Sequence, residues 1–263
     1  MPANEMQHAS AVVERITKAV EQGVDLNTLL SLGQQSTIVN TATSPAKKSP
    51  DITIAIAKDA AFGFYYADDL EAMSEAGAKI ILFDTLHDTC LPPCDGLLLG
   101  GGFPETHMQS LSQNKPMLQS IKMAIDAGLP CYAECGGLMY LCNQISYQGE
   151  SANMVGVIPG SITMLKKPQG RGLVKLQTTK HSLWPQFAQV NQQFNAHEFH
   201  YAKLEGLPNH MNYAYEVKRG FGIDGQHDGL IIKNCLASFS HLRNSHKTPW
   251  VSAFIDFVKK HAR

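Results

Sequence analysis

The chain has 263 residues, a formal net charge of −1, 44% hydrophobic residues and 17% charged residues. This balance is typical of a globular protein with a sizeable core, and it excludes the basic surface that nucleic acids and anionic membranes attract. The first residues lack a secretory signal and no stretch approaches the roughly 20 apolar residues of a membrane span, so we expect a cytoplasmic protein.

The start of the chain is predicted to be helical. Apolar residues recur at helical spacing over residues 8–32. Residues 34–50 are polar, rich in Ser and Thr, and contain two prolines, a composition typical of a linker. We therefore expect a small helical piece over 1–33, a linker over 34–50, and a main domain over 51–263.

The main domain opens with alternating strands and helices. Its first apolar run is rich in β-branched residues, as a buried parallel strand should be, and glycines follow both predicted helices at the usual stop position. This order is typical of an open parallel sheet flanked by helices. We predict strands over 52–57, 79–83, 95–99 and 129–133, and helices over 66–76 and 115–127.

After about residue 145, the pattern changes to short alternating runs. Such runs indicate strands in an antiparallel or mixed addition to the sheet. The expected fold is therefore an α/β open sheet, mostly parallel with an added antiparallel part, flanked by helices. We predict these later strands over 154–158, 172–178, 211–217, 229–232 and 235–240, and a final helix over 249–260.

Cys135 is the strongest candidate for a catalytic residue. It follows the predicted strand 129–133 and precedes Gly136, Gly137 and a helix-compatible stretch, which is the pattern of a nucleophile turn. Glycine permits the sharp turn and the close approach of backbone that such a site needs. The free N–H groups at a helix start favour a thiolate and can hold the oxyanion that forms when sulfur attacks a carbonyl.

A cysteine nucleophile needs a base, and the chain offers eleven histidines. His241 follows the predicted strand 235–240 and therefore could lie at the same sheet edge as Cys135. His197 and His200 are the next candidates. They could also suggest a metal site, but a pair spaced by three residues without a third ligand is weak support for one.

The triple glycine at 100–102 follows the predicted strand 95–99. It forms either a simple tight turn or a bare backbone that supplies a second oxyanion donor beside the nucleophile. It is not a phosphate-binding loop, because no Gly-Lys-Ser/Thr follows it, and the 263 residues contain no such motif.

The six cysteines predict neither a disulfide framework nor a metal site. Cys90 with Cys94 and Cys131 with Cys135 lack the two-residue gap of a zinc knuckle. Apart from Cys135, we expect most cysteines to be small buried hydrophobic residues. No metal and no bound cofactor are expected.

Several motifs together resemble a known family. They read, in chain order, AKDAAFGFYYADDLEAMSEAGAKIILFDTLHD, CDGLLLGGGFPE, CYAECGGLMYL, HEFHYAKLE and DGLIIKNCLASFSHL. Together these segments resemble the glutaminase half of cobyrinic acid a,c-diamide synthases, in the cobalamin branch of the class I glutamine amidotransferases. The resemblance covers residues 51–243, and residues 8–32 are similar to the end of the preceding synthetase domain.

The resemblance implies a reaction and a set of site residues. Cys135 would attack the side-chain amide of glutamine and form a glutamyl thioester, and His241 would be the base. Gly101 or Gly102, together with Gly136, would form the oxyanion hole. Ammonia would pass to an ATP-activated carboxylate on a corrin-type ring. ATP and Mg²⁺ belong to the synthetase domain, which is absent from these residues, and an ATP-dependent synthetase domain in trans could be a partner.

The chain departs from the family pattern in two places. His241-Leu242-Arg243 replaces the usual His-Leu-His, and other class I relatives carry an acid at the position of Arg243, so the residue that orients His241 is open. The segment 170–173 also differs from the family's Gly-Tyr-Arg-Glu. These departures, with the missing phosphate loop, leave a catalytically silent binding or partner module as the alternative. A cysteine hydrolase of another substrate is a third reading.

Overall fold

The computed structural model describes residues 9–34, 50–184 and 189–262. The chain forms two compact units, residues 1–46 and 47–263, which we describe separately. In the first unit, two helices occupy most of the region predicted to be helical. Most of the expected linker lies outside the described residues, and the assignment of 1–33 as the end of a synthetase domain stays a prediction. The helices are α1 (Ala9–Gly23) and α2 (Leu26–Gln34).

The second unit is built on a nine-stranded sheet with the order β11-β10-β13-β14-β15-β6-β4-β1-β3. From β3 to β15 all neighbours pair in parallel, and from β15 to β11 all pair antiparallel. This arrangement confirms the predicted open sheet with an antiparallel addition. The strands are β1 (Ile52–Ala57), β3 (Ala78–Phe83), β4 (Gly96–Leu99), β6 (Cys131–Glu134), β10 (Gly170–Thr178), β11 (Gln193–His200), β13 (Asn212–Arg219), β14 (His227–Ile232) and β15 (Cys235–Ser238).

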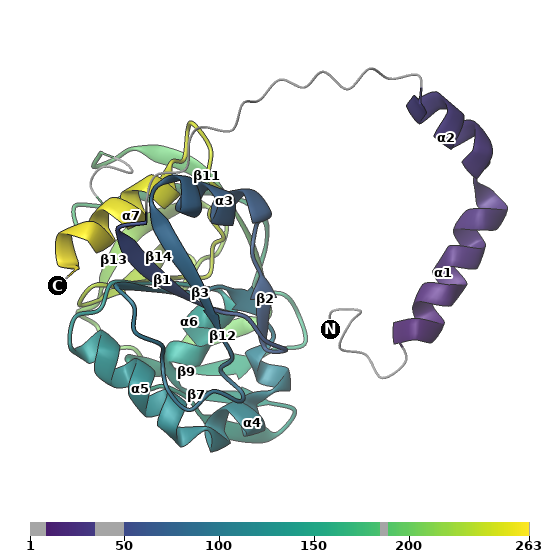
Figure 1. Ribbon diagram of the computed structural model, residues 1–263. Coiled ribbons are helices and arrows are strands. Elements are labelled where there is room, and N and C mark those ends of the chain that lie inside the picture. The colour runs from purple at the N-terminus through teal and green to yellow at the C-terminus, as the bar shows by residue number, and fades with distance from the viewer. Residues whose placement is uncertain (1–8, 35–49, 185–188, 263) are drawn as a thin grey trace. The chain divides into compact units, whose positions relative to one another are not determined.

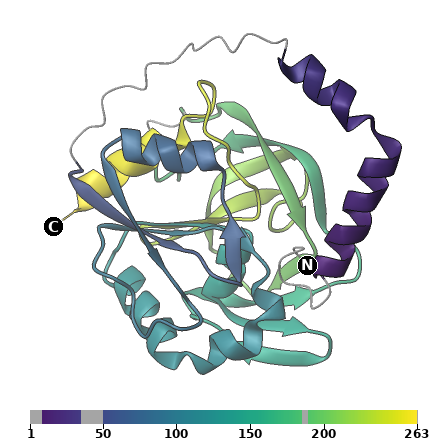
Figure 2. The same ribbon diagram turned by 45° about the vertical axis from the view of Figure 1, so that its right-hand side comes forward.

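Helices cover both faces of the sheet, with α3 and α7 on one face and α4 and α5 on the other (Figures 1 and 2). A four-stranded sheet, β12-β9-β7-β8, and the pair β2-β5 complete the fold. The remaining elements are α3 (Ala67–Glu75), α4 (Met108–Gln113), α5 (Lys115–Asp126), α6 (Gly136–Leu141), α7 (Trp250–His261), the 3-10 helix η2 (Pro104–Thr106), β2 (Phe62–Phe64), β5 (Gly101–Gly102), β7 (Cys142–Tyr147), β8 (Glu150–Asn153), β9 (Ile158–Met164) and β12 (Ala202–Glu205).

The two faces of the sheet have separate cores. Along β1, Ala55 and Ala57 pack into the core on one face, while Ile54 and Ile56 pack into the core on the other face. Because side chains alternate along a strand, a strand covered on both faces must be apolar throughout. This explains why the run 52–57 was recognisable as a parallel strand.

The prediction for 154–158 is wrong except at its last residue, because β9 begins only at Ile158. Residues 154–157 are apolar since they pack in the core as an irregular segment, and their N–H groups donate to carbonyls of residues 140–143. Cysteine burial follows the expectation for Cys131, Cys142 and Cys235, whereas Cys90 is exposed.

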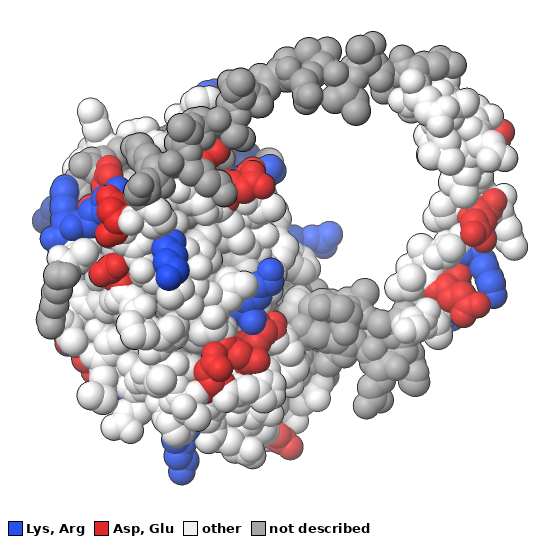
Figure 3. Space-filling model, in the orientation of Figure 1, with Lys and Arg blue, Asp and Glu red and all other residues white. Residues whose placement is uncertain are grey.

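The surface of the second unit carries charges of both signs. On the face drawn in Figure 3, acidic and basic side chains lie in small groups separated by uncharged surface. Among the helices of the described residues, none combines the length and the apolar composition needed to span a membrane.

Candidate active site

Cys135 lies on a strained turn between β6 and α6. Its φ of 47° and ψ of −99° are unusual for a residue with a side chain. The turn is held by a hydrogen bond from the Cys135 N–H to the Ser238 carbonyl (2.7 Å) and by the first helical bond, from Met139 N–H to the Cys135 carbonyl (3.0 Å). The residue is 8% exposed, and its Sγ lies 4.0 Å from the Phe199 carbonyl oxygen. The thiol is thus presented at the carboxyl end of the sheet, where the sequence placed it.

The glycines around Cys135 allow two loops to touch. A Cβ on Gly137 would lie 2.2 Å from the Leu99 carbonyl oxygen, and one on Gly136 would lie 2.9 Å from Gly102 N. A Cβ on Gly102 would lie 2.0 Å from the Ala61 carbonyl oxygen. The triple-glycine segment therefore packs backbone to backbone against the start of α6. Since Gly136 is the first residue of α6, its N–H has no acceptor within the helix.

Gly101 lies against the candidate base. A Cβ at Gly101 would approach His241 Cε1 to 2.9 Å and the Phe64 Cβ to 3.2 Å. The structure thus brings Gly101, Gly102 and Gly136 to one place with Cys135 and His241. Their roles as oxyanion donors stay predictions.

His241 is buried beside the nucleophile, on the chain that follows β15. Its backbone forms an isolated bridge with His197, through hydrogen bonds of 2.6 and 3.2 Å. Burial alone would lower the pKa of His241, but hydrogen bonds with the side chains of Cys135 and Glu134 outweigh it and raise the pKa to about 10. A pKa of about 10 keeps the imidazole positively charged at neutral pH.

Glu134 is the partner of His241 that the sequence reasoning missed. Its Oε2 lies 3.2 Å from His241 Nδ1, and its Oε1 accepts hydrogen bonds from Leu242 N (2.9 Å) and the Tyr132 hydroxyl (2.5 Å). The available signal was its place directly before the nucleophile, on a strand that pairs with β15. In that register Glu134 stands opposite Ser238, three residues before His241.

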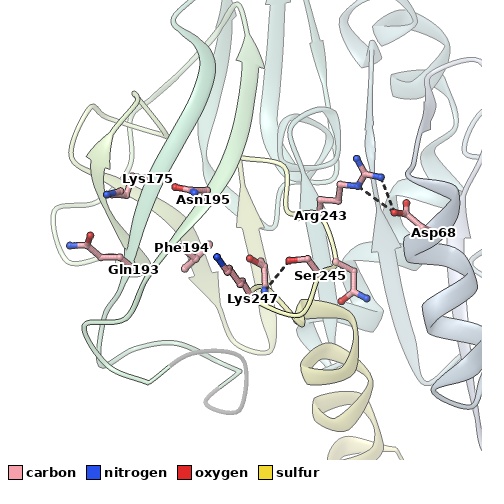
Figure 4. A pocket seen from close by; sticks show the side chains of 10 residues that line it. Asp68, Lys175, Gln193, Phe194, Asn195, Arg243, Ser245 and Lys247 are labelled. Carbon is pink, nitrogen blue, oxygen red and sulfur yellow. Dashed lines mark hydrogen bonds and ion pairs between the residues drawn. The ribbon is translucent and has the colours of Figure 1, made fainter.

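The side chain of Arg243 is engaged by residues at the start of α3. Its guanidinium forms an ion pair with Asp68 at 3.0 Å and lies 5.2 Å from the centre of the Tyr66 ring. Figure 4 shows this pair at one side of a polar depression of about 680 Å³, which Lys175 and Lys247 also line. The residue that replaces the usual histidine thus lines a polar surface depression and pairs with an acid of α3.

The other two candidate histidines do not form a metal pair. On β11, His197 faces outward, while His200 is buried, stacked on Phe239 at 4.1 Å, with its Nδ1 3.0 Å from the Ala202 carbonyl. Among the described residues, no three His, Cys, Asp or Glu side chains are arranged to hold a metal ion.

A second buried carboxylate, which the sequence analysis also missed, binds the backbone that leads to His241. Asp228 on β14 accepts hydrogen bonds from the Ser238 hydroxyl (2.9 Å) and from the N–H groups of Phe239 (3.0 Å) and Ser240 (2.9 Å). It therefore fixes the turn between β15 and the base. Asp228 stands at the start of the DGLI segment and was recognisable only as part of the resemblance.

An open α/β sheet with a cysteine on a strand–helix turn, a buried histidine beside it and bare glycines against both belongs to the class I glutamine amidotransferase fold. Solved structures share the fold of this chain. A glutamine amidotransferase of Thermotoga maritima matches with a TM-score of 0.52 at 14% identity, covering 80% of this chain and 84% of that chain. PurLQS of the same organism matches with a TM-score of 0.59 at 11% identity, covering 81% of this chain and 99% of that chain.

The sequence itself belongs to the CobB/CobQ-like glutamine amidotransferase family, whose domain matches residues 53–248. The cobyrinate a,c-diamide synthase of Magnetococcus marinus is 39% identical, over 99% of this chain and 57% of that protein. The synthase of the same name from Methanosphaera stadtmanae is 38% identical, over 92% of this chain and 53% of that protein. The chain thus spans about half the length of the curated relatives that it matches.

Proposed function

We propose that this chain hydrolyses glutamine with Cys135 as the nucleophile and His241 as the acid and base. The observation that carries the proposal is the pairing of a thiol on a strained turn, in a residue that is 8% exposed, with a buried imidazole whose pKa is raised by that same thiol and by Glu134. A charged imidazole beside the sulfur provides both a thiolate and a proton for the leaving group.

The steps follow from this charge arrangement. The thiolate of Cys135 attacks the amide carbon, and the carbonyl electrons move to oxygen. As the tetrahedral intermediate collapses, the C–N bond breaks and the departing nitrogen takes a proton from His241, leaving as ammonia. Neutral His241 then accepts a proton from water, whose oxygen attacks the thioester and releases glutamate and the thiolate. N–H groups of Gly136 and of Gly101 or Gly102 stabilise the oxyanion.

We further propose that the ammonia is used by an ATP-dependent synthetase. The support is twofold. The curated relatives named cobyrinate a,c-diamide synthase are about twice as long as the matched region, and a corrin-type carboxylic acid is the acceptor that their name suggests. Apolar side chains also surround the site: Phe64 is 52% exposed, and Phe199 is 48% exposed, with its carbonyl against Cys135. A partner that covered these rings would shield the ammonia from water.

The test measures glutamate release from glutamine by the pure chain, with Cys135→Ala as the control. A diazo-ketone analogue of glutamine, detected by mass spectrometry, serves in parallel because it alkylates a competent nucleophile without turnover. We expect an adduct on Cys135 that excess glutamine suppresses. Absence of the adduct would support the silent-module alternative, and an adduct indifferent to glutamine would support a hydrolase of another substrate.

A further inference from the structure

Four carboxylates hold the segment that carries the candidate base. Each one binds a different part of residues 238–244, and together they come from three separate elements, α3, β6 and β14. Asp228 binds residues 238–240, Glu134 binds residues 241 and 242, Asp68 binds the side chain of residue 243, and Asp69 accepts from the N–H of residue 244.

Glu134 is the member of this set that touches the imidazole. One of its oxygens lies 3.2 Å from His241 Nδ1, and the other is occupied by Leu242 N and the Tyr132 hydroxyl. Because both oxygens are engaged, the carboxylate cannot rotate away. Its side chain is 10% exposed and that of His241 is 6% exposed, so water competes little for the contact.

We propose that Glu134 is the positioning residue of the site, which holds His241 in the orientation and charge state that the reaction needs. With Nδ1 bound to the carboxylate, Nε2 is the ring nitrogen left for Cys135. A carboxylate in this place selects the tautomer with its proton on Nδ1 when the ring is neutral and stabilises the imidazolium when it is charged. This inference rests on the proposed function for its catalytic consequence.

The charged and titratable groups near the pair come from several elements. Cys135 acts on His241 from the turn after β6, and the His197 ring lies 6.4 Å from the His241 ring on the β11 side. Near Glu134, burial and the negative charges of Glu134 and Asp68 raise the pKa of Asp69 to about 6. Arg243 forms its ion pair with Asp68. Glu134 is the acid that contacts the imidazole directly.

The test compares Glu134→Gln with Asp228→Asn, two changes that each remove one buried charge and keep the size of the side chain. The titration of His241 is followed by NMR in protein labelled at histidine Cε1, with His241→Gln to assign the signal. For Glu134→Gln we expect the His241 pKa to fall from about 10 by more than one unit, and glutamine turnover to fall by about 10²–10⁴-fold in kcat with little change in KM.

Asp228→Asn should lower the thermal stability and leave the His241 titration in place, because Asp228 binds the turn and does not touch the ring. Glu134→Asp keeps the negative charge, so the His241 pKa in this variant should lie between the values in Glu134→Gln and in the unaltered chain. If His241 of the unaltered chain titrates near the ordinary 6.5, the proposal fails whether or not any variant folds. It also fails if Glu134→Gln leaves the titration unchanged. If the titration behaves as expected but the chain never releases glutamate, the proposed function fails and the positioning role stands.

Discussion

The two ends of strands β6 and β15 place very different groups side by side. At the amino ends, Cys131 and Cys235 stand opposite each other in register. Just beyond the carboxyl ends, Cys135 and His241 interact. Burial, together with the side chain of Cys235, raises the pKa of Cys131 well above its ordinary value. Cys131 and Cys135, four residues apart, thus have different neighbours, and the reactivity that we propose for Cys135 depends on where the strand stops.

The two cysteines differ because one lies within the regular strand and the other lies where the strand ends. Cys131 is within a regular strand, with parallel neighbours on both sides and apolar side chains around it. At Cys135 the strand turns into α6, so the regular ladder ends there and a buried carboxylate, Glu134, can reach the imidazole. The sheet therefore keeps one thiol neutral and places the other beside a charged ring.

The largest expected contrast is in glutamine turnover. Cys135→Ala should reduce glutamate release by about 10⁴-fold or more, since a nucleophile and its base act as a unit. Cys131→Ala should retain turnover within about threefold and cost about 1 kcal/mol of stability, as a small buried side chain is lost. A coupled glutamate assay and thermal melting measure both. Equal losses of activity in the two variants would contradict the assignment of the nucleophile.

Two glycine substitutions compare the carboxyl end of the sheet, at Gly102, with the amino end, at Gly96. Gly102→Ala places a methyl group 2.0 Å from the Ala61 carbonyl oxygen, a backbone atom that cannot yield without opening β5 from β2. Gly96→Ala, at the amino end of β4, meets methyl groups of Ile54 and Val258 at 2.8 Å, which can rotate. We expect Gly102→Ala to lose turnover by about 10²-fold or more, and Gly96→Ala to retain turnover at a stability cost of about 1–3 kcal/mol. Full activity in Gly102→Ala would show that the triple-glycine segment takes no part in the reaction.

The parallel half of the fold was predictable because its signals are local. Strand β1 occupies the predicted residues 52–57, since a strand buried on both faces must be apolar throughout. The turn at Cys135 was equally predictable, because Cys-Gly-Gly after an apolar run indicates a sharp passage from a strand to a helix. In contrast, β5 consists of two glycines, and five of the eight residues of β11 are polar, so neither resembles a buried strand.

The support around the base was not predictable for a different reason. Glu134 and His241 are 107 residues apart, and no local sequence pattern around either residue indicates that the two are in contact. The contact depends on β6 pairing with β15, a register that only the folded sheet provides. Sequence reasoning searched for the orienting acid two residues after the histidine, where Arg243 stands, and Arg243 binds Asp68 instead.

The free energy of unfolding should depend on pH through His241 at one end of the strands and through Cys131 at the other, over different pH ranges. Because the pKa of His241 is raised from 6.5 to about 10, the native state holds a proton that the unfolded chain releases between these values. The contribution to the free energy of unfolding is therefore complete below about pH 6.5 and is lost as the pH rises toward about 10. Cys131, whose ordinary pKa is 9.0, adds a loss only at higher pH.

Urea unfolding between pH 6.5 and 8.5 tests this separation. We expect the stability of the unaltered chain to fall across this window, His241→Gln to flatten the fall, and Cys131→Ala to leave its slope unchanged. A flat profile in the unaltered chain would show that His241 is not held charged by Glu134 and Cys135.

The smallest expected effect concerns the thiol pair itself. Cys131 and Cys235 share a side-chain hydrogen bond in a dry, apolar environment. Since thiols are weak donors and acceptors, a double-mutant cycle of Cys131→Ala and Cys235→Ala should give a coupling energy below about 1 kcal/mol, measured by chemical denaturation. The double variant should keep its glutamine turnover, because neither residue reaches the carboxyl end of the sheet. A coupling well above this value, or a loss of turnover, would mean that the amino ends of the two strands control the distance between Cys135 and His241, and that the contrast between the two ends is mechanical as well as electrostatic.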